Sequence, residues 1–227
     1  MSTSARMRHF HEELDALKSR LLDMSALAEE LVRNAVEALL ERDTAKAEGV
    51  ILGDRELDAL EMELDDRSLH LLALQQPMAR DLRLITMVMR ISNDLERVGD
   101  HAVNIAEAVG TLSQHPRFDP LPEIEEMARH AREMLSDALD DFVRGDSRAA
   151  REVCARDDQV DALYGSVIRI LLTHMMEDAR RIGPSMSLFL VAENLERIAD
   201  LATNIAEDAV FLVEGRTIKH RAESRAG

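Results

Sequence analysis

Two stretches of the sequence are nearly identical: DLERVGDHAVNIAE at residues 94–107 and NLERIADLATNIAE at residues 194–207. Nine of the fourteen positions are the same, and the members of each pair are 100 residues apart. In both stretches apolar and small side chains recur at intervals of three and four positions, which is the spacing of one face of an α-helix. The chain therefore contains an internal repeat whose best-preserved part is helical.

The repeat extends towards the N-terminus with a slightly larger separation. Asp43-Thr44 corresponds to Asp146-Ser147, 103 residues later. The same separation relates two pairs of aspartates, Asp54 with Asp157 and Asp58 with Asp161. Because the matched region covers more than one helix, we predict that the repeating unit is a bundle of helices.

Hydrophobic periodicity and helix breakers divide the chain into six long helices. Proline opens a helix but does not continue one, and Asp, Ser and Thr cap the first turn of the helix that follows them. The predicted helices are 6–41, 45–74, 78–110, 121–143, 148–179 and 185–213. We therefore predict an all-α fold made of two pseudo-symmetric three-helix bundles.

The repeat also sets the expected domain boundaries. Residues 1–113 are predicted to form the first bundle, and residues 123–214 the second. Residues 114–122 carry Pro116, Pro120 and Pro122 and are expected to link the two bundles. Residues 215–227 are rich in basic side chains, and we expect a disordered tail there.

Composition excludes several classes of protein. With 28 Lys and Arg against 44 Asp and Glu, the net charge is -16, and such a surface repels a nucleic-acid backbone. Cys154 is the only cysteine, which excludes an internal disulfide or a cage of thiolate ligands. No uninterrupted apolar run approaches the roughly 18–20 residues of a membrane span. We expect a soluble, cytoplasmic protein that does not bind nucleic acid directly.

Small side chains line the second half of helix 78–110 and the equivalent part of helix 185–213, at Gly99, Ala102 and Ala106 and at Ala199, Ala202 and Ala206. Small residues let two helices approach each other closely. The two segments could pack against each other, between the halves or between subunits. Alternatively, each could pack inside its own bundle, and the sequence leaves both arrangements open.

Rows of carboxylates follow the same helices in both repeats. Glu96, Asp100 and Glu107 lie within about 40° of one another on a helical wheel. Their counterparts are Glu196, Asp200 and Glu207, and the helix before each of them carries a second row, Asp54, Asp58, Glu61 and Asp65 in the first repeat and Asp157 and Asp161 in the second. Clustered oxygen ligands suit hard cations such as Mg²⁺, Mn²⁺, Ca²⁺ or oxidised iron. We predict a cation site on each bundle, with Glu61, Glu107 and Glu207 as secondary candidates.

Two other interpretations of the acidic rows remain open. They could be solvated faces partly neutralised by Arg97 and Arg197, or metal-free docking surfaces for basic patches on partner proteins. A metal-storage or metal-redox protein of the di-iron type is disfavoured, because such centres need Glu-x-x-His and no histidine has Glu three positions before it. His101 points about 100° away from the carboxylate row and is expected at a surface or interface. The sequence contains no motif of a catalytic nucleophile or a phosphate-binding loop, so we predict that the protein is not an enzyme.

The doubled segment L-E-R-[VI]-[GA]-D-x-[AV]-x-N-I-A-E, together with PMARDLR at residues 77–83, resembles the PhoU family from about residue 9 to residue 214. The resemblance implies two three-helix bundles in a protein that is commonly a homodimer. It also implies a negative regulator of the phosphate-starvation response. Such regulators couple the ATPase subunit of a phosphate ABC transporter to a membrane sensor histidine kinase.

Metal binding is a further implication of the resemblance. Some members carry multinuclear clusters of iron or another metal on E/D-x-x-x-D motifs, so we expect iron, manganese, magnesium or zinc on oxygen ligands here. Those motifs match Asp54 and Asp58, Glu96 and Asp100, Asp157 and Asp161, and Glu196 and Asp200. The second repeat has Tyr164 and Ile168 where the first has Glu61 and Asp65, so we expect a weaker second site or one with fewer ligands.

Overall fold

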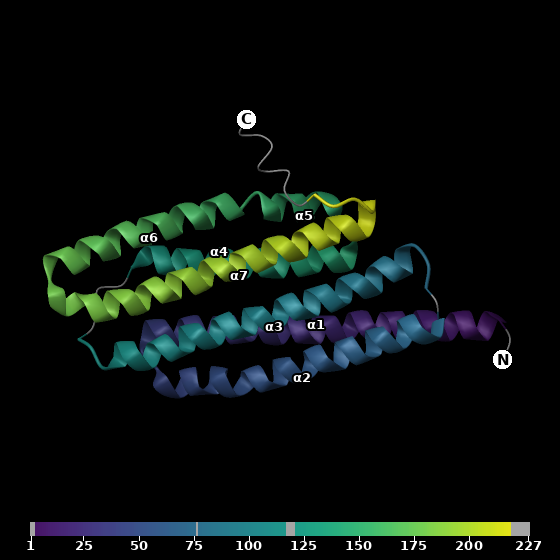
Figure 1. Ribbon diagram of the computed structural model, residues 1–227, viewed down its shortest axis with the longest axis horizontal. Coiled ribbons are helices and arrows are strands. Elements are labelled where there is room, and N and C mark those ends of the chain that lie inside the picture. Colours follow the sequence, from purple (N-terminus) through teal and green to yellow (C-terminus); the bar gives the residue numbers. More distant parts are fainter. Residues whose placement is uncertain (1–2, 76, 117–120, 219–227) are drawn as a thin grey trace.

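The computed structural model describes residues 3–75, 77–116 and 121–218. All regular secondary structure in these ranges is helical, in seven α-helices and one 3₁₀-helix (Figure 1). The first repeat contains α1 (Thr3–Glu41), α2 (Thr44–Gln75) and α3 (Arg80–Ser113). The second contains α4 (Pro122–Arg144), α5 (Ser147–Cys154), α6 (Asp157–Glu177), η1 (Ala179–Arg181) and α7 (Ile182–Glu214). The all-helical fold with two repeats is confirmed.

Equivalent aspartates begin the second helix of each repeat. One carboxylate oxygen of Asp43 accepts hydrogen bonds from the backbone N–H groups of Ala45 and Lys46, each at 3.0 Å. Asp146 caps α5 in the same way, with N···O distances of 3.1 Å to Arg148 and Ala149. These bonds satisfy amide groups that have no partner inside the helix. Both breaks therefore fall where the sequence predicted them.

The fifth predicted helix, 148–179, is wrong as a single element. The structure breaks it at Ala155 and Arg156 into α5 and α6, although neither proline nor glycine is present there. The amide of Arg156 bonds to the carbonyl of Val153 at 2.9 Å, three residues back instead of four, which tightens the turn. The Arg156 side chain leaves the helix to contact Asp137 of α4 at 2.7 Å. A tertiary contact between helices, which periodicity does not encode, accompanies this break.

The predicted break at Gly183-Pro184 lies a few residues earlier in the structure. Helix α6 ends at Glu177, and Asp178 caps the short η1 through the amide of Arg180 at 2.9 Å. Helix α7 then begins at Ile182, so Pro184 falls in its first turn. Proline is tolerated there because the first amides of a helix have no internal partner.

The helices form two layers that share one continuous hydrophobic core (Figure 1). Helices α1, α2 and α3 pack together, as do α4, α6 and α7, and the layers meet through α3 against α7 and α1 against α4. Met24, Leu95 and Leu195 are completely buried in this core. Helices α2 and α6 therefore lie on the outer edges of the molecule, where α2 packs beside α3 and α6 packs beside α7 (Figure 1).

Helices α3 and α7 cross in opposite directions at the junction of the repeats. At one end Arg90 forms an ion pair with Asp208 at 3.0 Å, and at the other end His101 and Asn104 both bond to Asn194. Residues early in α3 thus meet residues late in α7, as expected for two repeats related by a local two-fold axis. The interface position of His101 agrees with its prediction.

At Gly99 the structure decides between the two arrangements of small residues. A Cβ atom at this position would meet Leu57 and lie 2.5 Å from a carboxylate oxygen of Asp54, both on α2. The small side of α3 at this point therefore faces its own bundle, and α3 uses other residues to meet α7. No helix in the described ranges is long and apolar enough to cross a lipid bilayer.

Two candidate cation sites and the groove between the repeats

The first carboxylate cluster lies between α2 and α3. Asp54 and Asp58 project from α2 one turn apart, and Glu96 and Asp100 project from α3 in the same way. Asp54, Glu61 and Glu96 are partly buried, whereas Asp58 and Asp100 are exposed. The structure therefore brings all four predicted ligands of the first repeat, and Glu61, onto neighbouring faces of α2 and α3, where their charges act on one another.

Asp54 holds an unusual position in this cluster. Its Oδ1 atom is buried and has no hydrogen-bond partner among the described residues. It rests against the backbone of Gly99, where any side chain would collide with it. A buried carboxylate oxygen without a donor is costly. A positive ligand between α2 and α3 would remove that cost.

Burial and mutual repulsion disfavour the charged state of Asp54, Glu96 and Glu61. Burial raises the pKa of Asp54, and the charges of Asp58 and Asp100 raise it further. Burial also raises the pKa of Glu96, with added repulsion from Asp100, Glu61, Asp58 and Asp54. For Glu61 the pKa is raised by burial and then by Asp65 and Asp58. The neighbouring faces of α2 and α3 thus concentrate negative charge that no basic side chain named in these pKa shifts compensates.

The second cluster lies at the equivalent place between α6 and α7. Burial raises the pKa of Asp161, and the charge of Asp200 raises it further. Burial also raises the pKa of Glu196, as do Asp200, Asp161 and Asp157. The four predicted ligands of the second repeat therefore act on one another electrostatically. Thr203, which the sequence did not single out, lies near Asp157 and partly offsets the rise in the pKa of that carboxyl.

The two clusters differ in how they are neutralised. Arg197 contacts Asp200 at 3.2 Å and Glu196 at 3.5 Å. Arg97, its counterpart, instead contacts Asp94 at 3.7 Å, on another side of α3. The interpretation as a neutralised acidic face thus describes the second cluster in part, whereas no arginine within the described ranges forms an ion pair with the first.

The secondary candidates are placed less uniformly. Glu61 belongs to the first cluster, but Tyr164 replaces it in the second and packs against Phe189 with ring centres 6.3 Å apart. Glu107 lies at the edge of a separate groove between α3 and α7. Glu207 lies near Cys154, whose pKa is raised to about 11, first by burial and then by Glu207 and Asp157. A neutral, half-buried thiol of this kind is a packing residue.

In the part of the chain that the structure describes, no three His, Cys, Asp or Glu side chains lie close enough together to hold a metal ion as they stand. The carboxylates of each cluster lie on neighbouring helix faces without converging on a point. This is the arrangement that repulsion produces when like charges have no counter-ion. Any cation would have to draw the exposed Asp58 and Asp100, or Asp161 and Asp200, inwards by changes of side-chain rotamer.

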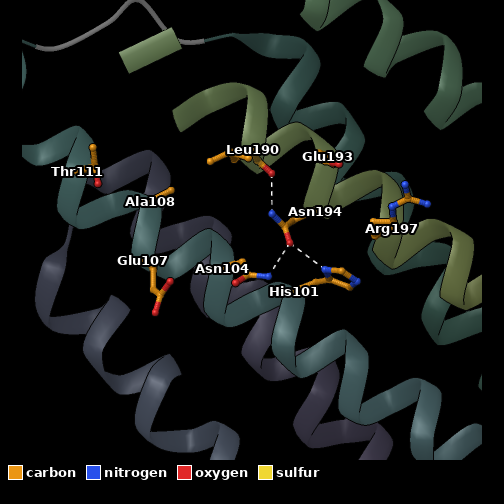
Figure 2. Close-up of a pocket in the computed structure, with 9 residues that line it drawn as sticks. All are labelled: His101, Asn104, Glu107, Ala108, Thr111, Leu190, Glu193, Asn194 and Arg197. Atoms are coloured by element: carbon orange, nitrogen blue, oxygen red, sulfur yellow. Dashed lines mark hydrogen bonds between the residues drawn. The ribbon is translucent and has the colours of Figure 1, made fainter. Parts of the chain in front are cut away.

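A third feature is the groove of about 500 Å³ between α3 and α7 (Figure 2). On its floor, the side-chain oxygen of Asn194 accepts hydrogen bonds from His101 Nδ1 at 2.8 Å and Asn104 Nδ2 at 3.0 Å. The amide nitrogen of Asn194 donates to the carbonyl of Leu190 at 2.7 Å. Sequence reasoning did not find this groove, because its residues come from both repeats. The one available signal was that His101 and Asn194 break the repeat, with Leu201 and Asp94 at the matching positions.

Asp157 provides a test of the electrostatics by pH. Its pKa is raised from 3.8 to about 6, mainly by burial and then by Asp200 and Asp161. Between these values the unfolded chain binds fewer protons than the folded one, so this residue lowers stability as the pH rises from about 4 to about 6. The variant Asp157→Asn, free of metal, should be roughly 1–2 kcal/mol more stable than the parent at pH 7, after discounting for solvent exposure.

Urea unfolding at pH 7 and pH 4 measures this effect, and most of the gain should disappear at pH 4. Asp66→Asn, an exposed aspartate of α2, is the matched control and should change little at either pH. An equal gain for Asp157→Asn at both pH values would contradict the assigned cause.

The fold and its grooves define a helical repeat protein that presents two equivalent acidic faces at its outer edges. The model of the PhoU domain matches the chain twice, at residues 21–109 and 124–209. The chain belongs to the PhoU family.

Known proteins resemble it over nearly its whole length. A phosphate-specific transport system accessory protein PhoU homolog of Clostridium acetobutylicum is 38% identical, covering 92% of this chain and 96% of that protein. The crystal structure of PhoU from Pseudomonas aeruginosa has a TM-score of 0.88 at 36% identity, covering 91% and 100% of the two chains. That of the phosphate transport system regulatory protein PhoU from Streptococcus pneumoniae has a TM-score of 0.86 at 29% identity, covering 92% and 99%. These relatives are named as accessory and regulatory proteins, in agreement with the prediction that the chain is not an enzyme.

Proposed function

We propose that this protein is a negative regulator of the phosphate-starvation response. It would act in the cytoplasm, commonly as a homodimer, and couple the ATPase subunit of a phosphate ABC transporter to a sensor histidine kinase. The observation that carries the proposal is the two-fold match to the PhoU domain over most of the helical region, at residues 21–109 and 124–209, together with relatives named for phosphate transport. The elongated, two-faced shape suits an adaptor, because separate faces can meet separate partners.

A phosphate-responsive reporter tests this role in cells that lack the protein. Its deletion should raise reporter expression in phosphate-rich medium, and the intact chain should restore repression. Normal repression in the deletion strain would contradict the proposal. The purified protein should also bind the ATPase subunit of the transporter encoded in the same organism.

We further propose that the acidic face of each repeat holds a hard cation on oxygen ligands. Asp54, Asp58, Glu96 and Asp100 would hold it in the first repeat, and Asp157, Asp161, Glu196 and Asp200 in the second. Iron, manganese, magnesium or zinc would each supply positive charge and no chemistry of catalysis. The support is the orphaned Oδ1 of Asp54, the all-oxygen donor set and the raised pKa values on both faces.

Metal removal and titration with Mn²⁺ test the two sites. Asp54→Asn with Asp100→Asn should weaken binding at the first site by at least about tenfold, because each change removes a charged ligand. The second site should bind more weakly from the start, because Arg197 already occupies two of its carboxylates. Calorimetry with metal analysis gives the affinity and the stoichiometry.

Terbium(III) provides a readout for the second site alone. The chain has one Tyr and no Trp, and Tyr164 lies beside Glu196, so terbium bound there should be sensitised by tyrosine excitation. Asp200→Asn should reduce this emission, while Asp100→Asn should not. Unchanged metal content in the double variant Asp100→Asn with Asp200→Asn would overturn the assignment of both sites.

The metal-free docking surface is the second candidate for the acidic faces. It is favoured by the exposed, non-convergent carboxylates Asp58, Asp100 and Asp161. In that case partner binding should survive a chelator and be lost at high salt, because exposed charge contacts are screened. A metal-mediated interaction should show the reverse sensitivity to chelator.

A further inference from the structure

An exposed apolar line on α7 leads into the groove between the repeats. Ile182, Met186 and Leu190 are four residues apart and expose 46%, 47% and 50% of their surface. Residues at this spacing lie on one side of a helix. The matching residues on α3 are Leu82, Thr86 and Arg90, so most of the line is absent from the first repeat. It is therefore a feature of α7 and not a requirement of the repeated fold.

The floor of the groove is preformed and polar, but its polar atoms are already used. Asn194 accepts from His101 and Asn104 and donates to the Leu190 carbonyl (Figure 2). A small polar metabolite gains affinity from side chains that still need partners. This floor offers few side chains that still need a hydrogen-bond partner, so it is poorly suited to a small polar metabolite. A preformed surface does, however, lower the free-energy cost of binding a protein segment.

The charge of the groove between α3 and α7 indicates which kind of protein segment could bind there. Glu107 and Glu193 stand at its edges, and neither has an ion-pair partner within the described ranges. Arg197 also lines the groove, but its guanidinium is shared by Glu196 and Asp200. The surface therefore combines an apolar line with uncompensated negative charge.

We propose that the groove between α3 and α7, with Ile182, Met186 and Leu190, is the docking site of an amphipathic helix from a partner protein, with basic residues beside its apolar face. A helix of this kind buries the apolar line and places its Lys or Arg near Glu107 and Glu193. A second copy of this chain docked through the same surface fits poorly, because it would bring its own Glu107 and Glu193 against the same two carboxylates. The inference rests on the proposed adaptor role.

Synthetic peptides of 18 residues test the docking site directly. The first has Leu at positions spaced by three and four and Lys elsewhere. The second has Glu in place of Lys, and the third has the composition of the first in an order without an apolar face. Fluorescence anisotropy at physiological salt should show binding of the first peptide and at least about tenfold weaker binding of the other two.

Two exposed substitutions locate the contact. Met186→Asp with Leu190→Asp should weaken the first peptide at least about tenfold, although the added acids would strengthen a purely electrostatic association. The control Leu82→Asp, at the exposed position of α3 that matches Ile182, should leave the affinity unchanged or slightly higher. Glu107→Gln with Glu193→Gln should weaken binding several-fold, and Glu56→Gln, an exposed acid on α2, should not.

Three results would overturn the docking site. The first is equal affinity for the scrambled peptide, and the second is undiminished affinity of the Met186→Asp, Leu190→Asp variant for the first peptide. The third is that the free parent protein sediments as a dimer and this variant as a monomer. The last result would make the face an interface between copies. A variant that lacks peptide binding but restores phosphate repression in the deletion strain would reject docking as part of the adaptor role. Failure of the intact chain to repress rejects the proposed function itself.

Discussion

Replacing Gly99 by valine should destabilise the protein by about 3 kcal/mol, because the position has no room for a side chain. A Cβ atom would collide with Leu57 and lie 2.5 Å from Asp54 Oδ1. Leu57 is completely buried, so its side chain cannot move without disturbing the core. The Asp54 side chain would be displaced from its position against α3, near Glu96 and Asp100. The change should therefore weaken both folding and any cation binding at the first cluster.

Gly110→Ala provides the matched control on the same helix. No atom outside the local helix lies within 4 Å of a Cβ placed there. Alanine loses less conformational freedom than glycine on folding, so this variant should gain roughly 0.5–1 kcal/mol. Urea unfolding followed by far-UV circular dichroism measures both variants. If Gly99→Val lowered the free energy of unfolding no more than Gly110→Ala does, the inferred close approach of α2 to α3 at Gly99 would be contradicted.

Much of the fold was predictable because the sequence repeats the residues that begin and end its helices. Asp43 and Asp146 cap helices at equivalent places, and short-range capping is readable without tertiary information. The break at Ala155 and Arg156 was not readable, because it depends on contacts such as Arg156 with Asp137 of another helix. This break lies just before Asp157, in the second repeat, where Ala199 is the counterpart of Gly99.

The candidate sites were predictable as sets of residues but not as arrangements. Helical spacing correctly placed Asp54 and Asp58 opposite Glu96 and Asp100, because the short connections force α2 and α3 together. Spacing did not predict that Arg197 would turn towards its carboxylates while Arg97 turns away, since rotamers follow the local packing of each repeat. The groove between α3 and α7 escaped detection because residues 90 positions apart in sequence form its floor.

The ion pair between Arg90 and Asp208 should be the most sensitive polar contact between the repeats. Asp208 exposes only 2% of its side chain, whereas Arg90 exposes 46% of its own, and they meet at 3.0 Å. Arg90→Leu leaves a buried charge without this partner and should cost about 2 kcal/mol, reduced from the fully buried case by the exposure of the arginine. Asp208→Ala should cost less, about 1 kcal/mol, because Arg90 can turn to solvent.

The repeat itself supplies the compensating double variant. At the opposite end of the α3–α7 contact, the residues that match Arg90 and Asp208 are Leu190 and Ala108, which line the groove together. Arg90→Leu with Asp208→Ala therefore copies a pair that the chain already carries, and replacing an ion pair by apolar residues is often nearly neutral. Its stability should return to within about 1 kcal/mol of the parent, giving a favourable coupling of about 2 kcal/mol in the double-mutant cycle. Additive losses would instead mean that each residue acts through separate contacts, and that the two ends of the interface are not interchangeable.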